Sequence, residues 1–100
     1  PRDAKYRHLS ATVVSGTKWS VLAPSSPFHL FVPQDTTMRT EFDRAVGYLS
    51  TWNMTYPHVK LYYNPREMEI TASYYTPTGE LGYCIGAVFN ETSRQFGFHS

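Results

Sequence analysis

The chain has 100 residues, 41% of them hydrophobic and 16% aromatic, and its formal net charge is +1. This length suits one domain with a modest core, and we expect residues 1–100 to form it. Aromatic richness with low net charge excludes a disordered composition. A charge near zero gives no long-range field for nucleic acids or acidic membranes. No apolar run approaches the roughly 18 residues of a membrane span, so we expect no membrane partner.

Cysteine usage bears on the cellular compartment. Cys84 is the only cysteine, so no internal disulfide can form, whereas small secreted domains usually depend on several. This favours a cytoplasmic location. The tripeptides Asn53-Met54-Thr55 and Asn90-Glu91-Thr92 match the N-glycosylation acceptor pattern and leave a secreted origin open. Pro1 is compatible with a native start after removal of Met and with an excised fragment.

The first third of the chain predicts a β-hairpin. Residues 5–14 are rich in β-branched and aromatic types, and Gly16 suits the positive φ of a two-residue loop. Residues 18–23 then fit the returning strand. After two prolines, residues 28–32 fit a short strand or an extended edge.

One helix is predicted over residues 36–51. Residues 35–37 offer side-chain oxygens for an N-cap. Arg39 and Asp43 stand four residues apart and predict an ion pair on the helix surface. Gly47, a weak helix former, suggests a close approach between backbones. Apolar residues at spacings of 4, 3, 4 and 3 form one stripe that would pack on a sheet: Met38, Phe42, Ala45, Leu49 and Trp52.

The second half predicts an antiparallel meander of three strands. Alternating residues 58–63 and 68–75 flank a turn with Pro65 at its second position. A three-residue turn with Gly79 at its left-handed position then leads into a strand over residues 80–90. Residues 95–99 can add a last extended piece. The sum is an α+β fold, with one helix on one face of a mostly antiparallel sheet.

The second turn also predicts a register, because it places Thr76 opposite Glu80. Counting outward, Tyr74 faces Gly82, Ala72 faces Cys84, and Ser73 faces Tyr83. In this register one face of the last strand carries an apolar stripe without an obvious cover. Either the N-terminal strands or residues 28–32 cover it, or a partner does, including a second copy of the chain. The stripe consists of Leu81, Tyr83, Ile85 and Phe89.

The sequence predicts no catalytic residues, metal ligands or cofactor. The four histidines are far apart and lack metal-binding spacings. Cys84 has no nucleophile motif around it and is expected to be a buried, inert filler. Glu67 and Glu69, beside Lys60, are typical of a solvated sheet face with cross-strand ion pairs.

The main functional hypothesis is a non-catalytic binding module. Eight tyrosines supply rigid apolar area with a polar tip, which suits protein interfaces. The protein would dock onto another protein as an inhibitor, regulator or adaptor, and would form a homodimer. The candidate interface residues are Tyr75, Leu81, Tyr83, Ile85 and Phe89.

Two alternatives remain open. Aromatic and basic residues on a sheet are typical of proteins that bind single-stranded nucleic acids, and the candidates are Tyr6, Arg7, Lys60, Tyr62 and Arg66. The other alternative is a small-molecule pocket, or an enzyme, between helix and sheet. Its lining would be Met38, Phe42, Trp52 and Met68, with His58 or Glu41 as the titratable group.

Overall fold

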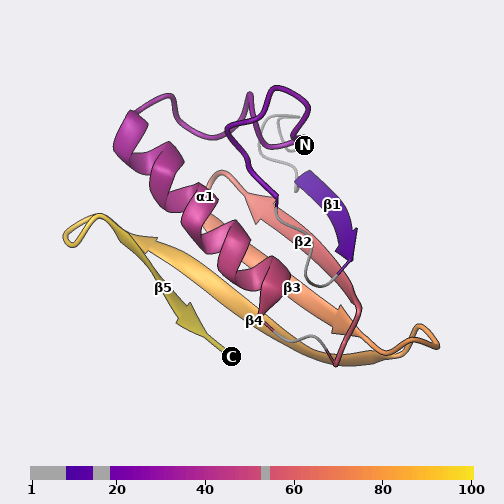
Figure 1. The fold of residues 1–100 in the computed structure, drawn as a ribbon. Helices are drawn as coiled ribbons and strands as arrows, with labels where there is room; N and C mark the ends of the chain where they lie inside the picture. The colour runs from indigo at the N-terminus through magenta and orange to yellow at the C-terminus, as the bar shows by residue number, and fades with distance from the viewer. Residues whose placement is uncertain (1–8, 15–18, 53–54) are drawn as a thin grey trace, which may run out of the picture.

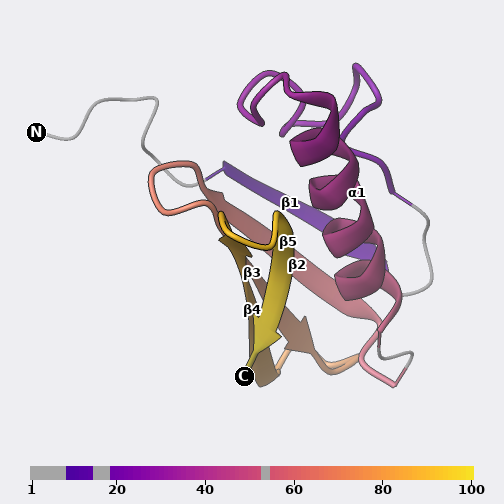
Figure 2. The same cartoon turned by 90° about the vertical axis from the view of Figure 1, so that its left-hand side faces the viewer.

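The computed structural model of the protein describes residues 9–14, 19–52 and 55–100 (Figure 1). One helix and a five-stranded antiparallel sheet confirm the α+β class, and the strands lie side by side in chain order. Figure 2 shows helix α1 along one face of the sheet. The elements are β1 (Leu9–Val14), α1 (Thr36–Thr51), β2 (His58–Asn64), β3 (Glu69–Tyr75), β4 (Leu81–Asn90) and β5 (Gln95–His99).

The predicted N-terminal hairpin is wrong. β1 pairs with β2 rather than with residues 18–23, and residues 21–32 form turns instead of strands. The carboxylate of Asp43 accepts hydrogen bonds from the backbone N–H of Val21 and, at 2.9 Å, from the hydroxyl of Ser20. Val21 is fully buried. These hydrogen bonds attach the segment to α1, so its backbone does not form the hydrogen-bond ladder of a strand. The loop expected at Gly16 lies outside the described residues.

Helix α1 confirms the predicted bounds. Asp35 caps it, since its Oδ1 accepts from the backbone N–H of Thr37 at 3.1 Å. The prediction of a close approach between backbones at Gly47 is wrong, because a Cβ there would meet no atom within 4 Å. Trp52, at the C-cap, remains 43% exposed. The other stripe residues are buried as expected: Met38, Phe42, Ala45 and Leu49.

The meander is confirmed and is one strand longer than the predicted three. β5 pairs with β4, as the pattern of residues 95–99 suggested. In the turn between β3 and β4, the N–H of Thr76 donates to the carbonyl of Glu80 at 2.9 Å, and Gly79 has a φ of 91°. These two observations confirm the predicted three-residue turn.

The register of β3 and β4 departs from the prediction immediately after this turn. Tyr75 pairs with Leu81 as expected, but Tyr74 pairs with Tyr83, so Gly82 is an extra residue in a β-bulge. A methyl group on Gly82 would overlap the ring of Tyr56, which explains why glycine fits there. A shift of one residue transfers every following side chain to the opposite face.

The shift turns most of the apolar stripe toward α1. Ile85 and Phe89 are only 8% and 6% exposed. The ring of Phe89 lies 5.4 Å from that of Phe96, which lies 5.6 Å from that of Phe42 in α1. The cover is thus α1 and β5 of the same chain, not the N-terminal strands, residues 28–32 or a second molecule. Leu81, which precedes the bulge, stays 57% exposed.

Candidate functional site

The face of the sheet opposite α1 holds part of the predicted nucleic-acid site. We call it the uncovered face, because no helix or strand of the described residues lies over it. Lys60 and Tyr62 alternate with the buried residues of β2, and the amino group of Lys60 lies 4.8 Å from the ring centroid of Tyr75. Arg66 lies in the exposed turn after β2. Tyr6 and Arg7 lie outside the described residues. The structure therefore places Lys60 and Tyr62 on one face, with the ring of Tyr75 beside Lys60.

The same face also carries Cys84. The prediction that this thiol is buried is wrong, because the register shift places Cys84 on the uncovered face, where it is exposed. Its sulfur lies 3.4 Å from the hydroxyl of Ser73. Nearby, Nε2 of His99 lies 3.4 Å from a carboxylate oxygen of Glu69. The negative charge of this carboxylate would repel the phosphate backbone of a nucleic acid bound to the same face.

The predicted pocket between helix and sheet does not assemble. Met38 and Phe42 are buried in the core, Trp52 lines a hollow elsewhere, and His58 is exposed. The carboxylate of Glu41 accepts two hydrogen bonds of 2.9 Å from Arg44, and these hold the pKa of Glu41 below its usual value. Glu41 is thus a structural acceptor.

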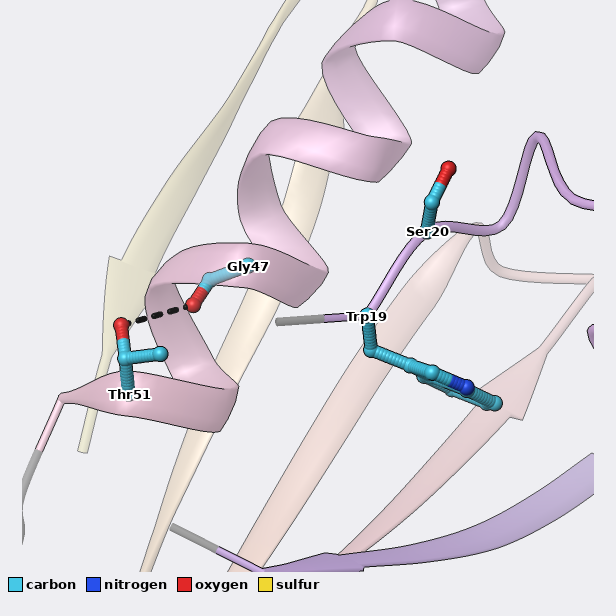
Figure 3. A pocket seen from close by; sticks show the side chains of 4 residues that line it. All are labelled: Trp19, Ser20, Gly47 and Thr51. Carbon is cyan, nitrogen blue, oxygen red and sulfur yellow. Dashed lines mark hydrogen bonds between the residues drawn. The ribbon is translucent and has the colours of Figure 1, made fainter. Parts of the chain in front are cut away.

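A hollow of about 430 Å³ lies between the second half of α1 and residues 19–20. Figure 3 shows Thr51 donating to the carbonyl of Gly47, at 2.9 Å, with the indole of Trp19 directed away from both. The indole packs against Phe28 instead. The lining of Trp19, Ser20, Gly47 and Thr51 offers apolar surface but no acid or base. Residues 15–18, next to Trp19 in the chain, lie outside the described residues.

Arg39 is a buried cation near the start of α1. Its guanidinium donates to the carbonyl of His29 at 2.9 Å and to Oε1 of Gln34 at 3.2 Å, and it lies 2.8 Å from Nδ1 of His29. The predicted pair with Asp43 is wrong, because that carboxylate binds Ser20 and Val21. Arg39 thus ties down the segment before the helix. A hollow of about 340 Å³ lies beside it, and both terminal nitrogens of the guanidinium already bind groups of the same chain.

A third hollow, of about 250 Å³, lies where β5 ends. Three of its aromatic side chains are exposed by 37–43%. The ring of Tyr48 lies 4.6 Å from that of Phe98, and the ring of Trp52 lies 5.5 Å from that of Tyr83. We call this hollow the aromatic notch. Its lining is Tyr48, Trp52, Ile85, Phe98, His99 and Ser100.

The aromatic notch adjoins a strand edge. β5 pairs only with residues 86–90 of β4, whereas residues 81–85 pair with β3 and with no other strand of the described chain. Figure 1 shows β5 ending about halfway along β4. The N–H of Phe89 donates to the carbonyl of Met68, on the β3 side, at 3.2 Å. Because strand residues alternate in direction, the N–H and C=O of Cys84 face the side of β5, beyond its end.

The aromatic notch was not predicted from the sequence. Trp52 belongs to the predicted helix stripe and Ile85 to the strand stripe, whereas Tyr48 and Phe98 had no predicted role. The available signal was the spacing of Tyr48 and Trp52, which are four residues apart and therefore neighbours on one helix face.

No protein-family model, curated protein or solved structure matches the chain. No helix among the described residues is long and apolar enough to cross a membrane. In the same part of the chain, no three His, Cys, Asp or Glu side chains gather as a metal site would require. The geometry of the hollows, edges and faces therefore carries the functional interpretation.

Proposed function

We propose that the protein is a non-catalytic module that docks onto another protein through the aromatic notch. The observation that carries this proposal is the clustering of Tyr48, Trp52 and Phe98, all partly exposed, around a hollow. Clustered exposed apolar side chains mark interaction sites. Tyrosine and tryptophan are also the side chains that most often anchor protein interfaces.

This interface differs from the one that the sequence suggested. Ile85 lines the notch and Tyr83 contacts Trp52, whereas Phe89 lies in the core. Tyr75 and Leu81 lie outside the notch. The stripe that suggested a homodimer is largely covered by α1, so the proposed partner is a different protein, with the chain as its inhibitor, regulator or adaptor. A cytoplasmic location, where thiols stay reduced, fits the exposed thiol of Cys84.

Single-stranded nucleic-acid binding is the second candidate. It is favoured by the contact of Lys60 with the ring of Tyr75, and by Tyr62 on the same face. Phosphate contacts release counterions, so this binding would weaken steeply as salt concentration rises. Docking through the aromatic notch would change little with salt.

A selection from a displayed library of random peptides tests the main proposal. Trp52→Ala and Tyr48→Ala should each lower the affinity for the selected peptides at least tenfold. Leu30→Ala is the matched control, because Leu30 is exposed near the other end of α1, and it should change nothing. Peptides that bind equally well to Trp52→Ala would refute docking through the aromatic notch. Salt-sensitive binding of oligo(dT), lost in Lys60→Ala, would favour the second candidate.

A further inference from the structure

The aromatic notch combines partly exposed aromatic rings with the C-terminal end of a helix. Tyr48, Trp52 and Phe98 all line the hollow. The faces of aromatic rings carry negative electrostatic potential and attract cations. Tyr48 lies in the last turn of α1 and Trp52 is its C-cap, where the helix dipole adds a partial negative charge. Both features favour a positively charged occupant over a neutral or negative one.

The described part of the chain supplies no cation of its own to the notch. The last turn of α1 contains no basic residue, and none of the described residues around the hollow is Lys or Arg. His99 is the one basic group in this lining. Its Nε2 lies 3.4 Å from a carboxylate oxygen of Glu69, whose charge would offset that of a protonated imidazole. The potential of the rings and of the helix end is thus available to a cation from a partner.

The lining suits a quaternary ammonium group better than the side chain of unmodified lysine or arginine. An ammonium brings three N–H donors and a guanidinium five, but the lining contains no Asp or Glu to accept them. A guanidinium is also flat and stacks on one ring, whereas the rings of Tyr48 and Phe98 are tilted by 46° to each other. A trimethylammonium group has no N–H and presents methyl groups in several directions. It therefore contacts tilted rings and leaves no donor unsatisfied.

We propose that the aromatic notch binds the side chain of a trimethylated lysine of the partner protein. Pockets for whole small molecules measure roughly 300–1,000 Å³, so a hollow of about 250 Å³ suits a single side chain. Methylation keeps the positive charge of lysine. Recognition then combines attraction between the cation and the rings with contact of the methyl groups against Ile85. The inference rests on the proposed function and names the group that the notch recognises.

The probe is a capped pentapeptide of glycine and serine with one trimethyllysine at its centre, titrated into ¹⁵N-labelled protein. The indole N–H resonance of Trp52 should shift and saturate, whereas that of Trp19, which lines a different hollow, should not move. Backbone amide shifts measure the affinity of the variants. Trp52→Ala and Tyr48→Ala should each lower it at least tenfold. Leu30→Ala is the matched control and should leave it unchanged.

A neutral peptide isolates the contribution of the charge. It carries the same side chain with a carbon atom in place of the quaternary nitrogen, so the shape is kept and the charge is removed. It should bind about tenfold more weakly than the trimethyllysine peptide. Fluorination of the tryptophan rings withdraws electrons from their faces. It should lower the affinity for the charged peptide and leave that for the neutral peptide unchanged, which a purely structural role of Trp52 would not produce.

The outcomes separate this inference from the proposed function. Equal affinities of the charged and neutral peptides overturn recognition of a cation and leave the notch as an apolar docking site. No shift of the Trp52 indole at about 10 mM peptide, which would occupy even a weak site, also overturns the inference. The library selection, which uses unmethylated residues, then judges the proposed function by itself. Phosphatidylcholine vesicles carry the same cationic group, and binding of these vesicles but not of the peptide would place a lipid headgroup in the notch, against the proposal.

Discussion

The two faces of the sheet are built from consecutive residues of the same strands, yet they do different things. On β2, Tyr63 is buried and Tyr62 lies on the uncovered face; on β3, Tyr74 is buried and Tyr75 is uncovered. The hydroxyl of Tyr74 donates to the carbonyl of Leu49 in α1, at 2.7 Å. Strand register, rather than composition, thus decides which tyrosines pack in the core and which lie on the opposite face of the sheet.

The largest expected effect separates Tyr74 from Tyr75. Tyr74→Ala removes a ring stacked on Tyr83 at 4.8 Å together with the bond to Leu49, and should cost about 3–5 kcal/mol of unfolding free energy. Tyr75→Ala loses a contact with Lys60 and should cost less than about 1 kcal/mol. Urea denaturation of both variants measures this difference. Equal losses would contradict the assignment of the faces.

The dependence of stability on alkaline pH probes the buried tyrosines of the sheet directly. Burial raises the pKa of Tyr63 from 10.0 to about 12, and burial, followed by the neighbouring Tyr83 and Tyr48, raises the pKa of Tyr74. The unfolded chain loses the Tyr63 proton near pH 10 while the folded protein keeps it. Stability is therefore complete below pH 10 and falls as the pH rises toward 12.

The expected loss for Tyr63 is about 2–3 kcal/mol, from 1.36 kcal/mol per pKa unit. Denaturation at pH 9 and pH 11.5 measures it, with tyrosinate absorbance followed in parallel. Tyr63→Phe should remove this part of the dependence and leave the part that Tyr74 contributes. A dependence that Tyr63→Phe leaves unchanged would contradict the burial of the Tyr63 hydroxyl.

The β-bulge at Gly82 determines on which face of the sheet the following side chains of β4 lie. It provides the next test. Gly82→Ala places a methyl group on the ring of Tyr56, which packs at 5.1 Å against the ring of Tyr83. Overpacking of this kind should cost about 1–3 kcal/mol. Tyr56→Ala should relieve that strain, so the double variant should lose less than the sum of the single variants. Strict additivity would mean that Tyr56 does not fix the bulge.

The smallest expected effect is a gain in stability rather than a loss. Gly47→Ala adds a methyl group that meets no atom within 4 Å, in the middle of α1. Alanine should therefore stabilise the helix by roughly 0.5–1 kcal/mol. Thermal denaturation measures it as a small rise in Tm. A fall in Tm would mean that the hollow beside Gly47 is filled in solution.

Local signals predicted the elements that depend on local chemistry. The cap at Asp35 and the helical spacing gave the bounds of α1, and the Pro77 and Gly79 pattern gave the turn. The register did not follow from these signals, because Gly82 serves equally well as a small partner of Tyr74 or as a bulge. The choice depends on the ring of Tyr56, which lies far away in the sequence.

The remaining errors also have tertiary causes. Residues 18–23 have a strand-like composition, but Asp43 captures the backbone of Val21. The aromatic notch combines side chains from the end of α1, from β4 and from β5, so no pattern within a single element predicts it. Trp52 continued the helix stripe in the sequence, yet at the end of α1 it lines the notch and remains partly exposed.

The central claim is that Tyr48, Trp52 and Phe98, around the aromatic notch, form an interaction site. The affinity of Trp52→Ala for the selected peptides tests it most directly, with Leu30→Ala as the control. We predict that Trp52→Ala binds these peptides at least tenfold more weakly than Leu30→Ala does. Equal affinities of the two variants would contradict the claim.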